Sequence, residues 1–399
     1  MAVAAARVAS SDFDPFSSET RRNPYAAYER LRAAGPVVRL TRYDIWAVPG
    51  FAEVKSVLED HANFSSAGGA GLANYFKQKP WRPPSIILEA DPPLHTRTRA
   101  VLARVLSPGV MRRLADEFKA RAVTLIDPLV EAGSFDAIRD IAEVFPISVF
   151  PDALGIDQEG RENFLTYGAM VFAGFGPEND YFRELMAKAA TVLPWVAAKC
   201  QRQALRPGSF GAQIYQAVDA GEISEEEGAL LVRSLLSAGL DTTISAIGMS
   251  LYSLARAPAQ WAVLAGNPTL ARSAFDETLR YDSAAPFVFR TTPHETVIAG
   301  VPIDGHEKIL LLVASANRDA TRWERADELD ITRRVSGHVG FGVGIHGCVG
   351  QMVARLEAEA VLSALAARVS RIEITGDVAY RESTGLRALS CLPLRVIPK

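Results

Sequence analysis

The segment from Phe341 to Gly350, FGVGIHGCVG, places a single cysteine within a run of glycines. A cysteine thiolate is a ligand for iron, and glycines remove the side chains that would collide with a flat bound group. Backbone N–H groups left free in such a loop can hydrogen-bond to the sulfur. A helix that begins near Val349 would also point its positive end at Cys348 and favour the thiolate. We therefore expect Cys348 to bind a metal, with an inert buried cysteine as the alternative.

The same loop satisfies a second pattern, because Gly342, Gly344 and Gly347 match the G-x-G-x-x-G of dinucleotide-binding folds. Dinucleotide binding requires a hydrophobic strand before the loop and a βαβ repeat around it. The preceding residues, 335–340, are interrupted by glycines, and too few residues follow the loop to build the repeat. The sequence therefore favours metal binding by Cys348 over dinucleotide binding.

The spacing Phe341-Gly-x-Gly-x-His-x-Cys-x-Gly350 closely resembles the haem-binding loop of the cytochrome P450 family. The resemblance implies that Cys348 is the iron ligand of haem b (iron protoporphyrin IX), with Phe341 and Gly350 against the haem. It also implies one cytochrome P450 domain over residues 1–399, mainly α with a small β region. In that fold the haem lies between a long central helix and the helix that follows the cysteine loop.

Glu277 and Arg280 are three residues apart, which places a carboxylate and a guanidinium on one face of a helix. Such a pair is usually a weak surface ion pair. Its place before the cysteine loop resembles the Glu-x-x-Arg pair of the family, which implies a brace for the core beneath the haem. Arg333 is the expected third member of this brace.

Haem carries two propionates, so the protein should supply several cations. His95 and Arg99 are one helical turn apart and share a helix face. Together with Arg290 and His338 they resemble the propionate ligands of the family. The alternative for each of them is a solvated surface charge.

The segment Ala238-Gly-Leu-Asp-Thr-Thr243 lies midway along a long predicted helix, where glycine and threonine are unfavourable. Thr242 can hydrogen-bond back to the Ala238 carbonyl and open a groove for dioxygen and water; a bend without chemistry is the alternative. The segment resembles the acid–alcohol pair of the family, which implies that Asp241 and Thr242 are catalytic and relay protons to dioxygen. A non-catalytic haem-binding protein, a further alternative, would not need this pair.

The remaining elements must position these side chains. A cap at Asn23 predicts a helix to about Ala34, and residues 37–40 and 43–48 are typical of a hairpin. Residues 65–85 are rich in glycine, proline and aromatic side chains and predict a long loop. A capping box at Ser224 begins a helix expected to run unbroken to about Arg256. We expect a β-rich portion over residues 36–50, 286–312 and 371–399, and helices elsewhere.

Composition excludes several classes of function. A net charge of -3 provides no basic field for nucleic acid, and 48% hydrophobic residues indicate a globular chain. No apolar stretch predicts a membrane span or a signal peptide, and three scattered cysteines suggest a reducing cytoplasm. These features resemble the soluble bacterial branch of the family, which implies a monomer that receives electrons from an NADH-dependent reductase through a ferredoxin. Four arginines could form the ferredoxin patch or simply a solvated helix face: Arg97, Arg104, Arg112 and Arg113.

The substrate is the last inference. Ser234, Ser237 and Ala238 fall on the helix face of Asp241, while Arg82 and Ser85 lie in the long loop. An arginine among hydroxyls suits a small aromatic carboxylate, and three rings could wall the pocket: Phe172, Phe175 and Phe289. The alternative is an exposed arginine and core phenylalanines. The sequence also resembles bacterial cytochromes P450 that oxidise para-substituted benzoates, which implies demethylation of 4-methoxybenzoate to 4-hydroxybenzoate and formaldehyde. A terpenoid or fatty acid substrate is the alternative.

Overall fold

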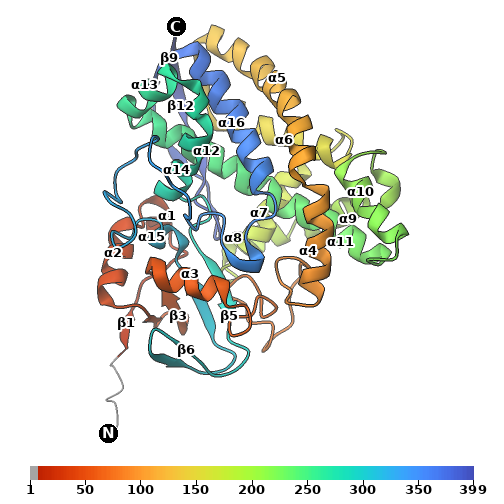
Figure 1. The fold of residues 1–399 in the computed structure, drawn as a ribbon, viewed down its shortest axis with the longest axis vertical. Coiled ribbons are helices and arrows are strands. Elements are labelled where there is room, and N and C mark those ends of the chain that lie inside the picture. The colour runs from red at the N-terminus through yellow and green to blue at the C-terminus, as the bar shows by residue number, and fades with distance from the viewer. Residues whose placement is uncertain (1–7) are drawn as a thin grey trace.

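The computed structural model describes residues 8–399, and most of its regular structure is helical (Figure 1). Short turns of other helix types occur at Ile138–Ala142, Arg202–Ala204, Pro268–Leu270 and Gly344–His346. The α-helices are α1 (Ser18–Arg22), α2 (Tyr25–Ala34), α3 (Phe51–Glu59), α4 (Leu94–Val105), α5 (Pro108–Ala132), α6 (Val144–Leu154), α7 (Asn163–Ala173), α8 (Asp180–Met186), α9 (Ala189–Lys199), α10 (Phe210–Asp219), α11 (Glu225–Gly239), α12 (Asp241–Ala255), α13 (Pro258–Gly266), α14 (Ala271–Tyr281), α15 (Val313–Ala316) and α16 (Gln351–Arg368).

The strands form two small sheets and two ribbons. A five-stranded sheet has the order β1-β2-β3-β8-β5 and lies below the helical body in Figure 1, whereas a three-stranded sheet has the order β4-β12-β9. The ribbons are β6-β7 and β10-β11. The strands are β1 (Ala9–Ser11), β2 (Val38–Leu40), β3 (Ile45–Val48), β4 (Ser134–Asp136), β5 (Val288–Thr291), β6 (Thr296–Ile298), β7 (Val301–Ile303), β8 (Lys308–Leu311), β9 (Val369–Ile374), β10 (Ala379–Tyr380), β11 (Leu389–Cys391) and β12 (Pro393–Pro398).

These elements agree with the predicted fold class. The hairpin β2–β3 is antiparallel, and residues 65–85 form neither helix nor strand apart from an isolated bridge between Ser65 and Thr291. The large helical core joins α5, α12, α14 and α16, and a second core lies under the five-stranded sheet. Strand β4 was not expected, because its three residues are too few to leave a pattern of alternation.

The central helix differs from the prediction of one unbroken element. It starts with the expected capping box at Ser224 but is interrupted at Leu240, between α11 and α12. The Thr242 hydroxyl donates to the Ala238 carbonyl at 2.6 Å, and Thr243 donates to Gly239 at 2.8 Å. These side-chain bonds occupy carbonyls that the backbone would otherwise use, so the helix opens at this point. Residues 225–255 are long and apolar enough to cross a membrane, but two-thirds of their most apolar window is buried in the molecule.

Candidate active site

The cysteine loop ends directly at the start of α16, with Gly350 as its N-cap. The Cys348 N–H donates to the Phe341 carbonyl at 2.8 Å, and the side chain keeps some accessible surface. Removal from bulk water raises the pKa of the thiol, while backbone N–H groups of Gly350 and Gln351 and the charge of Arg99 oppose that rise. The predicted support for a thiolate is therefore present as backbone donors and a nearby cation.

Gly344 explains part of the glycine content of the loop. Its φ is +70°, and a Cβ at this position would lie 2.5 Å from the Leu58 carbonyl oxygen at the end of α3. No other residue fits there, because the left-handed backbone and the close approach both exclude a side chain. No strand leads directly into the loop, since residues 317–343 contain none, so the dinucleotide alternative lacks the structure that it requires.

Four basic side chains form a cluster beside the cysteine: His95, Arg99, Arg290 and His346. The rings of His95 and His346 are 4.2 Å apart between centroids. Burial, followed by the charges of Arg290 and His95, lowers the pKa of His346 to about 3. Burial lowers the pKa of Arg290 to about 10. In residues 8–399, neither arginine has a carboxylate within ion-pair distance, and the Nε2 atoms of both histidines lack a hydrogen-bond partner. The cluster is therefore suited to an anionic ligand.

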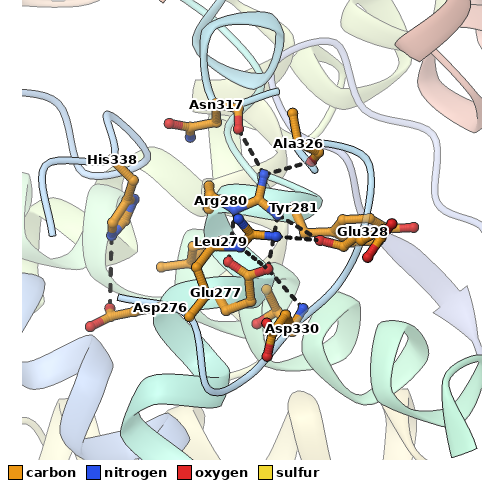
Figure 2. A network of polar contacts seen from close by, with 12 residues as sticks. Asp276, Glu277, Leu279, Arg280, Tyr281, Asn317, Ala326, Glu328, Asp330 and His338 are labelled. Carbon is orange, nitrogen blue, oxygen red and sulfur yellow. Dashed lines mark hydrogen bonds and ion pairs between the residues drawn. The ribbon is translucent and has the colours of Figure 1, made fainter. Parts of the chain in front are cut away.

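His338 does not belong to this cluster, which corrects the sequence-based assignment. Its Nε2 faces Asp276 at 3.9 Å, and its ring lies 5.9 Å from that of Phe341 (Figure 2). Burial lowers the pKa of His338 to about 4, and the nearest opposing charge is Asp276. His346 takes its place. The signal for it was already in the motif, where His346 stands two residues before the ligand and so within reach of the same bound group.

The Glu277–Arg280 pair is fully buried, unlike the surface pair that its spacing alone suggests. Arg280 donates to Glu277 through Nε at 2.7 Å and through Nη2 at 2.8 Å. It also donates to the carbonyls of Asn317, Ala326 and Glu328 (Figure 2). Arg333 adds a contact to Glu277 at 3.3 Å, as expected. The pair thus ties α14 to the chain that leads into the cysteine loop.

The break in the central helix coincides with accessible surface on a helix that is otherwise mostly buried. Ala238 is exposed, and Ser237 and Thr242 keep part of their surface. Ala238 and Thr242 are four residues apart and share one face of the helix, with Ser237 beside it, at the point where Thr242 binds the Ala238 carbonyl. The structure therefore shows the predicted opening beside Thr242.

Asp241 is turned away from that opening. Its Oδ1 accepts from Arg381 Nη2 at 2.5 Å, while Oδ2 is buried without a partner. On its other side, a Cβ on Gly168 would come within 3.0 Å of the Asp241 Cβ, so α7 needs glycine here. Arg381 keeps 20% of its side-chain surface exposed and connects the buried carboxylate to solvent. Sequence reasoning missed Arg381 because it follows Asp241 by 140 residues and belongs to no motif.

The structure brings Arg82, Ser85 and Ser234 together as predicted. The hydroxyls of Ser85 and Ser234 are 3.0 Å apart and join the long loop to α11. Arg82 is not a free cation, however, because its Nη1 lies 2.9 Å from the Glu89 carboxylate. Glu89 also accepts from the Ser85 N–H at 2.8 Å and from the Tyr75 hydroxyl at 3.2 Å. The Nε of Arg82 is buried and unpartnered within the described part of the chain.

Two of the three predicted ring walls lie at the end of α7, which contacts the long loop where the Leu72 N–H donates to the Phe175 carbonyl at 2.9 Å. Phe172 and Phe175 pack edge to face with centroids 5.3 Å apart at the end of α7. Phe289 is instead fully buried in the second core against Phe16 and Phe287, which corrects its assignment. Neighbouring residues of a strand face opposite sides, so Phe289 points away from the face that carries Arg290 and the half-buried Val288.

The four arginines proposed for a partner surface are all exposed, but they differ in their contacts. Arg97 pairs with Glu227 at 2.6 Å and Arg104 with Glu222 at 2.6 Å. Within residues 8–399, neither Arg112 nor Arg113 has a carboxylate at ion-pair distance. Only the latter two therefore offer an uncompensated charge.

The site fits haem. Cys348 offers a sulfur ligand for iron, with backbone donors and the charge of Arg99 beside it. The cluster of His95, Arg99, Arg290 and His346 has the charge to bind carboxylates such as propionates. The glycines of the cysteine loop and Ala238 on the central helix all keep accessible surface, against which a planar group can lie.

Comparisons with known proteins agree with this geometry. Residues 267–369 match the family described as Cytochrome P450. The chain is 52% identical over 386 residues to Cytochrome p450 CYP199A2 of Rhodopseudomonas palustris, covering 96% of this chain and 94% of that protein. It is 31% identical to Vitamin D(3) 25-hydroxylase of Pseudonocardia autotrophica, covering 97% of each. The structure of cytochrome P450 CREJ with (4-ethylphenyl) dihydrogen phosphate is similar with a TM-score of 0.88 and 27% identity, covering 96% of this chain and 99% of that one.

Proposed function

Since this chain belongs to the cytochrome P450 family and is a monooxygenase, we propose that it oxidises the para substituent of a benzoate. With 4-methoxybenzoate the reaction consumes dioxygen, two electrons and two protons and yields 4-hydroxybenzoate, formaldehyde and water. One oxygen atom enters the methyl group, whose bond to the ether oxygen then breaks, and the other leaves as water. The substrate class rests on the sequence resemblance and on the polar group formed by Arg82, Ser85 and Ser234.

The observation that carries the proposal is the link between the long loop and α11. Ser85 and Ser234 place two hydroxyls 3.0 Å apart among apolar side chains, and Arg82 adds a guanidinium whose Nε has no partner in residues 8–399. A carboxylate accepts hydrogen bonds from a guanidinium and from hydroxyls, and the Ser234 hydroxyl, which donates to the Leu230 carbonyl at 2.8 Å, would turn from that carbonyl to the carboxylate. Glu89 holds Arg82 in place, so binding requires little reorganisation of the guanidinium.

A solved relative supports the same chemistry. CREJ binds (4-ethylphenyl) dihydrogen phosphate, which is a para-substituted phenyl ring with an anionic group. In the present chain Phe172 and Phe175 provide the flat apolar surfaces that such a ring requires. We infer that the ring lies against them, with the carboxylate at Arg82 and the para substituent towards the cysteine loop.

Bound haem supplies the redox-active iron that activates dioxygen. Cys348 would be its protein ligand and would donate electron density through the thiolate. His95, Arg99, Arg290 and His346 would hold the propionates, and Phe341 would pack near the ligand. The cofactor expected is haem b.

Asp241 and Thr242 carry the proposed proton delivery. The Thr242 hydroxyl holds its proton on the accessible side of the helix, where it donates to Ala238. Asp241 has one oxygen paired with Arg381 and one oxygen free to take a proton. A proton from solvent can therefore reach Asp241 beside Arg381 and move towards Thr242.

The electron donor we propose is a ferredoxin served by an NADH-dependent reductase. Arg112 and Arg113 at the start of α5 supply exposed positive charge for an acidic partner. We further propose a cytoplasmic monomer that contacts neither nucleic acid nor membrane.

The test is a spin-shift titration of Arg82→Gln. We expect Arg82→Gln to raise the Kd of 4-methoxybenzoate by about tenfold to a hundredfold, the effect of losing one charge-assisted hydrogen bond. The neutral methyl ester should bind both proteins equally. Arg256→Gln, at an exposed arginine after α12, is the matched control. A red-shifted Soret band of the reduced carbon-monoxide complex first establishes the thiolate ligand.

Two outcomes would contradict the proposal. An Arg82→Gln variant with unchanged affinity would place the carboxylate elsewhere. If a terpenoid or a fatty acid shifts the haem spin state of the wild-type protein and benzoates do not, that ligand class replaces the proposed one.

A further inference from the structure

Lys308 is a buried amine that the proposed reaction does not use. It begins β8 and is 5% exposed. Its Nζ donates to the Gly69 carbonyl at 2.8 Å, to the Thr291 hydroxyl at 3.1 Å and to the Gly68 carbonyl at 3.3 Å. Among residues 8–399 no carboxylate comes within ion-pair distance of it. The Lys308 ammonium is held by neutral oxygen atoms and by the Phe289 ring, whose centroid is 5.4 Å from Nζ, and not by a carboxylate, so its charge is weakly supported.

The two carbonyls belong to a segment that we call the pocket loop, residues 65–75. Gly68 also accepts from the Tyr75 N–H at 3.0 Å, so the loop closes on the oxygen that Lys308 binds. The Leu72 N–H donates to the Phe175 carbonyl at 2.9 Å, which fixes the loop against the end of α7. A Cβ on Gly71 would lie 2.6 Å from the Phe175 Cα, so the two backbones are in close contact.

The pocket loop leads directly to the proposed carboxylate group. The Tyr75 hydroxyl donates to Glu89 Oε1 at 3.2 Å. The same carboxylate holds Arg82 and the Ser85 N–H. Lys308 is therefore connected to Arg82 through Gly68, Tyr75 and Glu89: the Tyr75 N–H and Lys308 both bind the Gly68 carbonyl, and the Tyr75 hydroxyl and Arg82 both bind Glu89.

We propose that Lys308 is a positioning residue whose ammonium holds the pocket loop closed and thereby makes carboxylate binding depend on pH. This inference rests on the proposed function for its choice of ligand. The ammonium has three N–H donors for the three oxygens around it. The neutral amine has two donors for the two carbonyls and a lone pair that can accept from the Thr291 hydroxyl, but its bonds to the carbonyls are no longer charge-assisted and are weaker. Loss of the proton therefore loosens the loop at Gly68 and Gly69.

The charges around Lys308 set the pH range. Burial, followed by the charge of Arg290 on β5, lowers its pKa to about 7, and Glu89 acts in the opposite direction. The ammonium is thus present below this pKa and is lost as pH rises through it. Propionates held at Arg290 would offset that cation and move the midpoint upwards. A carboxylate bound at Arg82 adds negative charge on the side of Glu89, so ligand binding and protonation of Lys308 favour each other.

The first experiment measures the loop directly in the haem-loaded protein. Hydrogen–deuterium exchange of residues 65–76 is compared at about pH 6.5 and about pH 9, after correction for intrinsic exchange. We expect the protection of the Leu72 and Tyr75 amides in the wild type to fall about tenfold at the higher pH, the effect of one charge-assisted hydrogen bond. In Lys308→Met the protection should be low at both values. Lys55→Met, at an exposed lysine on α3, should behave like the wild type.

Lys308→Arg keeps its charge over the whole range and should retain protection at the higher pH. It also provides a second variant if Lys308→Met does not fold, as judged by the carbon-monoxide spectrum. Wild-type protection that does not change with pH would overturn the proposal. A pH change that persists unaltered in Lys308→Met or Lys308→Arg would assign it to another group and would also overturn the proposal.

The second experiment is a titration with 4-methoxybenzoate, whose carboxylate is ionised throughout this range. We expect the wild-type Kd to rise by about tenfold between the two pH values and that of Lys308→Met to be high and constant. A constant wild-type Kd would refute the coupling to binding. If the wild type does not bind 4-methoxybenzoate at all, the proposed substrate fails, while the exchange measurement still decides whether Lys308 holds the loop.

Discussion

Glu277→Gln tests the buried brace with the largest expected effect on stability. Glu277 accepts from Arg280 at 2.7 and 2.8 Å, from Arg333 at 3.3 Å and from the Asp330 N–H at 2.9 Å. Glutamine keeps the shape but carries no charge, and its NH₂ group would face a donor of Arg280. Removing one partner of a buried ion pair costs about 3–5 kcal/mol because the other charge stays uncompensated. This loss is a large share of the roughly 5–15 kcal/mol that holds a folded domain together.

Urea unfolding of the haem-loaded protein measures this loss. With a slope of about 3 kcal/mol per M, the expected midpoint shift is about 1 to 2 M. Arg333→Gln removes the longest contact of Glu277 together with exposed hydrogen bonds from Arg333 to the carbonyls of Glu324 and Arg325, and should cost less, about 1–2 kcal/mol. Glu373→Gln is the matched control, because Glu373 pairs with Arg371 and Arg395 at the surface. A midpoint for Glu277→Gln equal to that of Glu373→Gln would refute the reasoning.

Three further predictions follow from contacts in the structure. Arg381→Gln leaves the Asp241 carboxylate buried without its cation, so we expect less 4-hydroxybenzoate per NADH consumed and an unchanged Kd of 4-methoxybenzoate. A yield of 4-hydroxybenzoate per NADH equal to that of the wild type would show that the pair plays no part in proton delivery. Replacing Arg112 and Arg113 with glutamate should slow reduction by ferredoxin by about tenfold at low salt in stopped-flow measurements, with the difference shrinking as salt rises. Equal reduction rates would move the partner surface elsewhere. Burial raises the pKa of Cys200 to about 12, so iodoacetamide near neutral pH should label it only after unfolding, as read by mass spectrometry; labelling of the native protein would contradict this.

The parts of the site that could be predicted are those encoded locally. Cys348 and its glycines lie in one loop whose spacing follows from the need for a close backbone approach. Glu277 and Arg280 lie one helical turn apart, and the bond from Thr242 to Ala238 follows from threonine in a helix interior. Their geometry depends on neighbours in the sequence, so the sequence was sufficient.

The errors arose where geometry depends on distant contacts or on the phase of a short element. Phe289 was assigned to the pocket because a strand of four residues does not reveal which of its alternating positions faces the core. His338 is a different kind of error, because the motif itself carries the better signal: His346 stands two residues before the cysteine, and the folded loop turns its ring towards His95. The pairing of Arg82 with Glu89 could not be foreseen, because it depends on how the long loop folds back on itself.

The order of strands in the three-stranded sheet determines when this sheet can form during protein synthesis. Strand β12 lies between β4 and β9 and is hydrogen-bonded to both, yet it leaves the ribosome after both of them. The nascent chain therefore carries β4 without its partner from the synthesis of Asp136 to that of Pro393, whereas β9 waits for β12 only briefly. The segment that follows β9 also delivers Arg381 to Asp241. A chain that stalls before residue 393 would lack the middle of this sheet rather than an edge.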